Sequence, residues 1–198
     1  MTNPNYVKAL VIQDSSGSMR GLATDVIGGF NSFIDDQKKI PGKFDVTLVQ
    51  FNSTAAEIFV DRPIQDVAEL TSADYQTGGG TALLYAVDWA VKRLGKKLAD
   101  LPEEERPGKV VVLIQTDGEE NMSPREIRRE DVKALIEQQQ NVYNWEFRFF
   151  GANVDAFREA ASLGIAAMHT ASYSADSKGV RGAYTTMSDT LRTMRTNP

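Results

Sequence analysis

The sequence contains no cysteine and only one histidine, His169. The absence of cysteine excludes disulfide bonds and every cysteine-based zinc site. A single imidazole also excludes a metal site built from several histidines. A metal site in this chain would therefore depend mainly on oxygen ligands.

The chain also lacks a long apolar run, an excess of basic residues and a nucleotide-binding glycine motif. The apolar segment after residues 1–5 is about eight residues long, too short to span a membrane, and no basic region or cleavage site makes it a secretion signal. The net charge of −5 disfavours contact with phosphate backbones. The absence of a G-x-x-x-x-G-K-[ST] sequence excludes a P-loop. We expect a cytoplasmic protein that binds neither nucleic acid nor membranes.

The 198 residues are 41% hydrophobic and 25% charged, and no linker divides them. This fits one domain over residues 1–198 with a core over about residues 6–195. Hydrophobic periodicity predicts alternating strands and helices. Strands are expected at 6–13, 44–51, 54–60, 110–115, 145–150 and 168–173, and helices at 19–34, 83–98, 131–139, 155–163 and 180–194.

The alternation predicts an α/β fold. Apolar strands joined by helical crossovers favour a doubly wound, Rossmann-like, mostly parallel six-stranded sheet with helices on both faces. The short connection after 44–51 makes 54–60 an antiparallel edge strand. The strands at 6–13 and 110–115 are expected to be central neighbours. Ligands of such sheets bind at the carboxyl ends of the strands, where the winding direction reverses.

Three polar segments are expected to converge at the carboxyl ends of the two central strands. Residues 14–18 (DSSGS) follow the first strand, residues 116–118 (TDG) follow the strand at 110–115, and residues 78–81 (GGGT) precede a helix. Their hydroxyl and carboxylate oxygens suit a hard cation, Mg²⁺ foremost, with Mn²⁺ or Ca²⁺ as alternatives. The candidate metal site consists of Asp14, Ser16, Ser18, Thr81 and Asp117.

In this order and spacing, D-x-S-x-S, G-G-T and T-D-G resemble the motifs of von Willebrand factor type A domains with a metal-ion-dependent adhesion site. The resemblance covers about residues 6–195. It implies that Ser16 and Ser18 bind the ion directly and that Thr81 binds it directly or through water. It also implies that Asp14 and Asp117 hold metal-bound waters. The stretch 149–153, which ends in Asn153, is similar to stand-alone intracellular members of the family from bacteria and phages.

A site of this kind implies a binding function. Because the carboxylates stay behind water, the ion keeps its affinity for an acidic group, and a carboxylate of a partner protein would complete its coordination. We expect a protein-interaction module without catalytic residues; the sequence does not predict its oligomeric state.

Other interpretations of the same residues stay open. One is a Mg²⁺-dependent phosphatase or phosphotransferase of the haloacid-dehalogenase kind, although position 16 is serine where these enzymes usually need a second aspartate. Another is a structural protein whose metal only stabilises the loops. Asp14 and Ser16 could also merely cap the first helix. A hydrolase triad with His169 is disfavoured because no G-x-S-x-G sequence surrounds Ser16.

The C-terminal helix adds one further expectation. In the family that the chain resembles, this helix can shift when the metal site changes its ligands. Met187 and Met194 adapt easily in packing, and Gly179 and Gly182 are expected to loosen the first turns. An ordinary packed terminal helix is the favoured alternative.

Overall fold

The fold was analysed in a computed structural model, which describes residues 2–152 and 155–196; Asn153 lies outside this range. The strands are β1 (Asn3–Asp14), β2 (Lys43–Phe51), β3 (Ala55–Pro63), β4 (Pro107–Thr116), β5 (Glu146–Ala152) and β6 (Thr170–Tyr173). The α-helices are α1 (Ala23–Lys38), α2 (Leu83–Ala99), α3 (Arg129–Tyr143), α4 (Ala156–Ser162) and α5 (Ser177–Thr196). Short 3₁₀ helices are η1 (Gly17–Leu22), η2 (Ile64–Asp66), η3 (Glu103–Glu105) and η4 (Ala167–His169).

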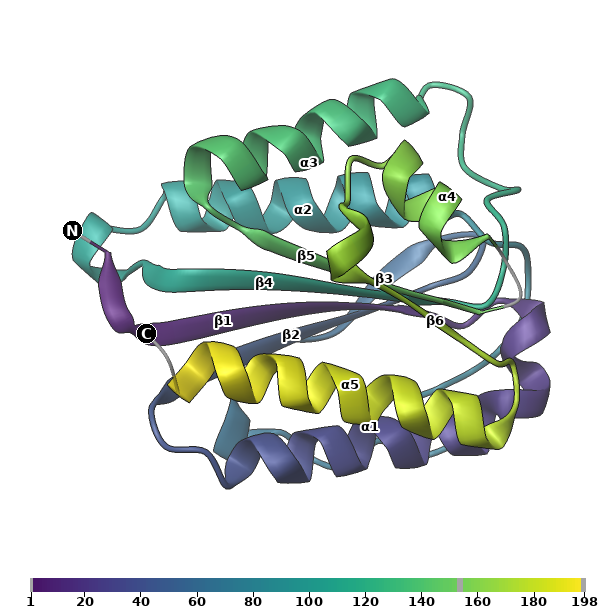
Figure 1. Ribbon diagram of the computed structural model, residues 1–198, viewed down its shortest axis with the longest axis horizontal. Coiled ribbons are helices and arrows are strands. Elements are labelled where there is room, and N and C mark those ends of the chain that lie inside the picture. The colour runs from purple at the N-terminus through teal and green to yellow at the C-terminus, as the bar shows by residue number, and fades with distance from the viewer. Residues whose placement is uncertain (1, 153–154, 197–198) are drawn as a thin grey trace.

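The six strands form one sheet in the order β3-β2-β1-β4-β5-β6 (Figure 1). β3 runs antiparallel to β2, and all other neighbouring strands are parallel. This confirms the predicted α/β fold, the antiparallel edge strand and the central pairing of β1 with β4. The winding direction reverses between these two strands, so a crevice for ligands is expected at their carboxyl ends.

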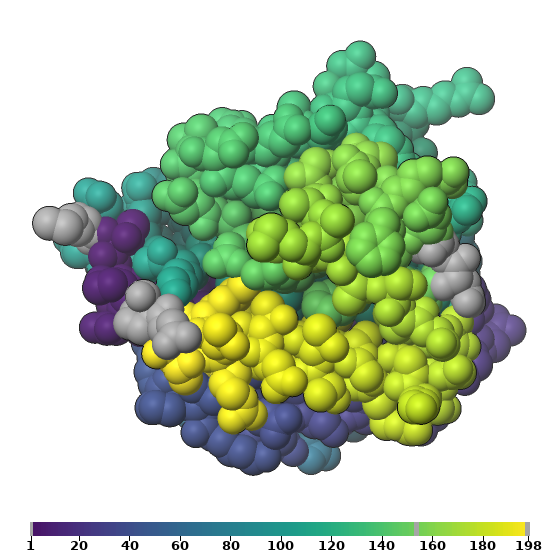
Figure 2. Space-filling view, in the orientation of Figure 1, coloured from purple at the N-terminus to yellow at the C-terminus, as the bar shows by residue number. Residues whose placement is uncertain are grey.

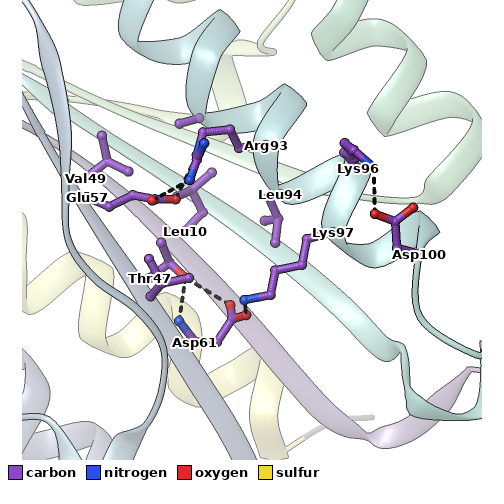
Figure 3. A pocket seen from close by; sticks show the side chains of 12 residues that line it. Leu10, Thr47, Val49, Glu57, Asp61, Arg93, Leu94, Lys96, Lys97 and Asp100 are labelled. Atoms are coloured by element: carbon purple, nitrogen blue, oxygen red, sulfur yellow. Dashed lines mark hydrogen bonds and ion pairs between the residues drawn. The ribbon is translucent and has the colours of Figure 1, made fainter.

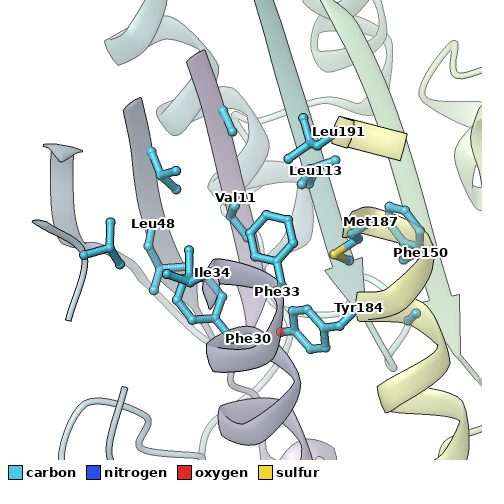
Figure 4. Packing of buried hydrophobic residues seen from close by; sticks show 14 of the residues in the cluster. Val11, Phe30, Phe33, Ile34, Leu48, Leu113, Phe150, Tyr184, Met187 and Leu191 are labelled. Carbon is cyan, nitrogen blue, oxygen red and sulfur yellow. The ribbon is translucent and has the colours of Figure 1, made fainter. Parts of the chain in front are cut away.

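Helices cover both faces of the sheet, with α1 and α5 on one side and α2, α3 and α4 on the other (Figure 1). Successive residues of β1 point to opposite faces. Val11 therefore packs under α1 and α5, whereas Ile12 packs under α2. Figure 4 shows the first of these cores, in which Phe30 of α1 and Tyr184 of α5 meet edge to face below the sheet. Burial on both faces explains why the β1 and β4 segments are almost continuously apolar.

The first helix differs from the prediction at its start. The sequence predicts a helix from Met19, but residues Gly17–Leu22 form the 3₁₀ helix η1, and α1 follows and extends to Lys38. A backbone bond from Met19 N to Ser16 O (3.1 Å) closes the tight turn. Apolar periodicity cannot separate the two helix types because both turn the same side chains inward.

The last strand is also shorter than predicted. It begins at Thr170 because residues Ala167–His169 form η4, whose turn is closed by a bond from His169 N to Ala166 O (2.9 Å). The prediction of a strand from Met168 was therefore wrong at its first two residues, and His169 does not lie in an edge strand.

Helix α5 is fixed to the rest of the fold at both ends. It lies across the front of the molecule beside α1 (Figure 2). At its start, Ser177 Oγ donates to Asp25 Oδ2 of α1 (2.6 Å), and two turns on, Gln13 Nε2 donates to the buried Tyr184 hydroxyl (2.6 Å). Near its end, the Arg195 guanidinium donates to the carbonyl oxygens of Gln37 and Ile40, both at 2.7 Å. A shift of α5 along the domain would break both sets of bonds.

The two glycines of α5 do not have the equivalent roles expected of them. A Cβ on Gly179 would lie 2.0 Å from the Ser174 carbonyl oxygen, whereas a Cβ on Gly182 would meet nothing within 4 Å. Gly179 therefore permits a close backbone approach that fixes the helix start. The expected loosening of the first turns stays a prediction.

We expect Gly179→Ala and Gly182→Ala to change stability in opposite directions. Gly179→Ala must displace the residue 174 backbone and should destabilise the protein. Gly182→Ala should stabilise it by about 0.5–1 kcal/mol, because alanine loses less backbone entropy in a helix. Urea denaturation of the two variants measures both effects. Equal shifts in the unfolding midpoint would contradict the assigned role of Gly179.

Candidate metal centre

The five candidate residues come together from three separate segments at one edge of the sheet. Asp14 ends β1, and Asp117 directly follows β4. These strands are adjacent and parallel, with Gln13 paired to Gln115, so their carboxyl ends meet. Ser16 and Ser18 lie at the start of η1, and Thr81 lies two residues before α2.

Three hydroxyls and one carboxylate of this set face a single small space. Ser16 Oγ and Ser18 Oγ are 3.0 Å apart, and Ser18 Oγ donates to Asp117 Oδ1 at 2.6 Å. A Cβ on Gly118 would lie 2.9 Å from Thr81 Oγ1 and 3.7 Å from Ser18 Oγ. The absence of a side chain at position 118 therefore keeps the space between these two hydroxyls open.

Asp14 is fully buried, and both of its carboxylate oxygens have donors. Oδ1 accepts from Ser16 N at 2.7 Å, and Oδ2 accepts from Thr116 Oγ1 at 2.5 Å. The side chain of Ser16 makes no capping bond to the helix that follows. The alternative in which Ser16 caps that helix through its hydroxyl is therefore wrong. Asp14 instead orients the serine loop (residues 15–18) through its bond from Ser16 N.

Backbone bonds join the serine loop to the glycine loop (residues 78–81). Gly78 N donates to Ser15 O at 2.9 Å, and Gly17 N donates to Gly79 O at 3.1 Å. Gly79 has φ of 72°, in the left-handed region that favours glycine, and a Cβ there would lie 2.6 Å from Ser53 Oγ. The glycines therefore permit a fixed close approach between the two loops.

Two residues that sequence reasoning missed, Glu120 and Asn121, fix the loop that follows β4. Asn121 Oδ1 accepts from the backbone N of Thr81 at 2.9 Å, which ties the loop after β4 to the loop before α2. Glu120 Oε2 accepts from Leu84 N at 2.7 Å and from Ser123 Oγ at 2.7 Å. Glu120 Oε1 accepts from the backbone N–H groups of Met122 (2.9 Å) and Ser123 (2.8 Å). The only sequence signal for these roles is the polarity of residues 119–123.

The two aspartates are in an environment that disfavours their charged form. Burial raises the pKa of Asp14 above its usual value, and hydrogen bonds from Thr116 and Ser16 oppose that shift. Burial likewise raises the pKa of Asp117, opposed by the bond from Ser18. A cation close to both carboxylates would compensate this cost.

These shifts predict that metal affinity depends on pH. A raised pKa means that protons bind Asp14 and Asp117 at a higher pH than they bind an ordinary aspartate. The proton then competes with the metal from that higher pH downward. We expect the apparent affinity for Mn²⁺ to fall as the pH drops from 7 toward the ordinary aspartate pKa of 3.8. Calorimetric titration across this range measures it; a constant affinity would contradict the prediction.

Carboxylates alone could not hold a metal here. Across residues 2–152 and 155–196, no three acidic, histidine or cysteine side chains gather into a metal-binding group. Hydroxyl oxygens would therefore have to supply part of the coordination, which Ser16, Ser18 and Thr81 can do. Such a mainly neutral donor set fits a hard cation that keeps several waters.

Another hollow, of about 280 Å³, lies between β3 and α2 (Figure 3). Its charged side chains neutralise one another. Arg93 pairs with Glu57 (2.7 Å), Lys96 pairs with Asp100 (2.7 Å), and Lys97 pairs with Asp61. Because these charges are already partnered, this hollow is a poorer candidate for an ionic ligand.

His169 does not contribute to the cluster of candidate residues. Its charged neighbours are Arg148 and Glu146 of β5. Burial, followed by the Arg148 charge, lowers the pKa of its imidazole. The side-chain partner of the Ser16 hydroxyl is the hydroxyl of Ser18, 3.0 Å away. The hydroxyl of Ser16 thus has no histidine beside it to act as a base.

No protein-family model matches the sequence, and no curated protein matches it. Several solved structures resemble the fold. One is the vWF domain of the type V pili tip protein Mfa5 from Porphyromonas gingivalis, with 11% identity, a TM-score of 0.65 and 96% of each chain covered. Another is a von Willebrand factor type A protein from Catenulispora acidiphila, with 16% identity, a TM-score of 0.63, and 93% of this chain and 42% of that chain covered.

A third similar structure is proximal thread matrix protein 1 from the mussel byssus, with a zinc-occupied MIDAS motif. It is 12% identical with a TM-score of 0.62, and the match covers 96% of this chain and 46% of that one. The chain thus spans less than half of the Catenulispora and mussel chains. At these identities the likeness concerns the fold alone. The protein has the fold of the von Willebrand factor type A domains.

Proposed function

We propose that this chain is a protein-interaction module that binds one divalent metal ion and presents it to an acidic side chain of a partner protein. Ser16, Ser18 and Thr81 would supply hydroxyl ligands, and Asp14 and Asp117 would hold metal-bound waters. The observation that carries the proposal is the convergence of these oxygens, from three loops, on one space at the carboxyl ends of β1 and β4.

The structural neighbours support this proposal by analogy. The mussel protein holds zinc in its MIDAS motif, and the Porphyromonas domain belongs to a pilus tip protein. Our chain has the same fold and has the D-x-S-x-S, G-G-T and T-D-G sequences at the carboxyl ends of β1 and β4. We propose Mg²⁺ as the ion, because oxygen donors suit hard cations and Mg²⁺ retains water readily.

The donor set explains why a partner carboxylate would bind. Neutral hydroxyls would leave most of the positive charge on the ion, and Asp14, whose oxygens accept from Ser16 N and Thr116 Oγ1, would act on it only through water. An incoming carboxylate would therefore find an ion whose charge is only partly compensated. Affinity and specificity would arise from this one charged contact together with the surrounding protein surface.

We propose a binding function rather than catalysis. The loops 15–18, 78–82 and 117–123 contain neither lysine nor histidine. A phosphotransferase of the haloacid-dehalogenase kind would need a lysine and a second aspartate there. Incubation with generic phosphoesters and Mg²⁺ tests this alternative; hydrolysis that Asp14→Ala abolishes would favour the enzyme.

The metal-binding part is tested by calorimetric titration of chelator-treated protein with Mg²⁺ and with Mn²⁺. We expect one site per chain. Absence of heat with both ions, confirmed by an unchanged melting temperature, would refute the proposal. Partner binding is tested by affinity capture with and without EDTA, with Asp14→Ala as the control. A partner retained equally in all conditions would not use the metal.

We expect the metal-free protein to stay folded. The two cores on either side of the sheet include no metal ligand among their buried apolar residues. Metal should then stabilise only by mass action, about 2.7 kcal/mol at a hundredfold excess over Kd. Loss of cooperative melting on addition of EDTA would favour the alternative of a purely structural metal.

In the described range, no helix has the length and apolar character needed to cross a bilayer. A cytoplasmic location and a bacterial or phage origin stay predictions. Cell fractionation with an antibody against the chain tests the location.

A further inference from the structure

Tyr75 contacts the candidate metal centre at the backbone of Asp14. It lies in the loop between η2 and α2, the loop that also carries Thr81. Its ring is buried, with 3% of the residue exposed, and its hydroxyl donates to the backbone carbonyl oxygen of Asp14. The sequence offers no signal for this role, because one tyrosine in a long polar loop fits no motif.

The Tyr75 bond extends a set of contacts between two loops. The backbone bonds from Gly78 N to Ser15 O and from Gly17 N to Gly79 O hold the glycine loop against the serine loop. The Tyr75 hydroxyl adds a third connection at Asp14, the residue at which β1 ends. Three bonds in a row therefore fix the chain from position 14 to position 17.

The position of this backbone decides where the candidate ligands lie. Asp14 Oδ1 receives its bond from Ser16 N, and the Ser16 hydroxyl lies 3.0 Å from Ser18 Oγ. A shift of the Asp14 carbonyl would therefore move a carboxylate and two hydroxyls together. A phenylalanine could fill the same apolar space as Tyr75 but could not hold that carbonyl.

We propose that Tyr75 is a positioning residue of the metal centre, whose hydroxyl fixes the Asp14 backbone and thereby sets the affinity for the ion. This inference rests on the proposed metal-binding function. It assigns to the loop between η2 and α2 a second contribution to the site besides Thr81.

The test compares Tyr75→Phe with the matched variant Tyr6→Phe. Tyr6 is also buried, and its hydroxyl donates to Asp45 Oδ2 at 2.7 Å, but it lies at the opposite end of β1. Each variant loses one buried phenol hydroxyl. We expect Tyr75→Phe to weaken Mn²⁺ binding about tenfold, as changes to groups that orient metal ligands do. Tyr6→Phe should bind Mn²⁺ as the wild type does. Calorimetry gives the affinities, and melting of the metal-free proteins gives their stabilities.

The outcomes separate the inference from the proposed function. If the wild type binds Mn²⁺ and Tyr75→Phe binds it equally well, Tyr75 is only a core residue and the inference is refuted. The same holds if both variants lose affinity in proportion to their loss of stability. If the wild type binds no metal, the proposed function itself fails.

A second measurement applies if Tyr75→Phe does not fold. In wild-type protein with ¹³C-labelled tyrosine, addition of Mg²⁺ should shift the ring signals of Tyr75 and leave those of Tyr6 in place. Unchanged Tyr75 signals at saturating Mg²⁺ would refute the inference.

Discussion

Replacing Asp14 with asparagine is expected to weaken Mg²⁺ and Mn²⁺ binding about a hundredfold, at the upper end of what changes beside a metal usually cost. Asparagine keeps the shape and can still accept from Ser16 N, which Asp14 Oδ1 does at 2.7 Å. It removes, however, the negative charge that would attract the cation from this buried position. The fold should be retained because the carboxylate is not part of either apolar core.

Asp45→Asn is a suitable control for this variant. Asp45 lies near the amino end of β2, far along the strands from the candidate metal centre, and its carboxylate accepts from the Tyr6 hydroxyl. Calorimetric titration should give it the affinity of the wild type. If Asp14→Asn binds Mn²⁺ as tightly as Asp45→Asn does, the charge at position 14 plays no part in metal binding.

The largest loss of stability is expected for Phe30→Ala. Phe30 is fully buried and packs against three aromatic rings from different elements: Phe33 of α1, Phe59 of β3 and Tyr184 of α5, with ring centroids 6.0–6.4 Å away. Truncation would leave a cavity where these elements meet. We expect a loss of about 3–5 kcal/mol in the free energy of unfolding, measured by urea denaturation.

Phe157→Ala provides the comparison for Phe30→Ala. Phe157 lies on α4 with 49% of the residue exposed, so its truncation should cost less than about 1 kcal/mol. Metal affinity should be unchanged in Phe157→Ala. Similar losses of stability in the two variants would contradict the view that the aromatic contacts of Phe30 join α1, β3 and α5.

Much of the fold was predictable because its signals are local. Near-continuous apolar segments such as 110–115 indicate strands buried on both faces, and the short 52–54 connection requires an antiparallel return. Once the order of strands and helices is known, right-handed crossovers leave few topologies. The candidate residues were predictable for a related reason: each follows or precedes a strongly periodic element, so the topology brings them to one edge.

What sequence reasoning missed depends on contacts between distant segments. Tyr75 reaches Asp14 across 61 positions, and Asn121 reaches Thr81 across 40. The role of Gly179 depends on the path of the Ser174 backbone, which no propensity encodes. The 3₁₀ start at Gly17 has the same inward-facing residues as an α-helix, so periodicity could not reveal it.

The hydrogen bonds of Glu120 have a consequence for how the centre would choose its ligand. An acidic side chain in the loop that follows Asp117 would be an internal competitor for the coordination position that we propose for a partner carboxylate. Glu120 cannot easily compete, because both of its oxygens are occupied by donors, including the Leu84 amide at the start of α2. To reach the ion it would have to expose that helix end. Self-blocking by Glu120 is thereby discouraged.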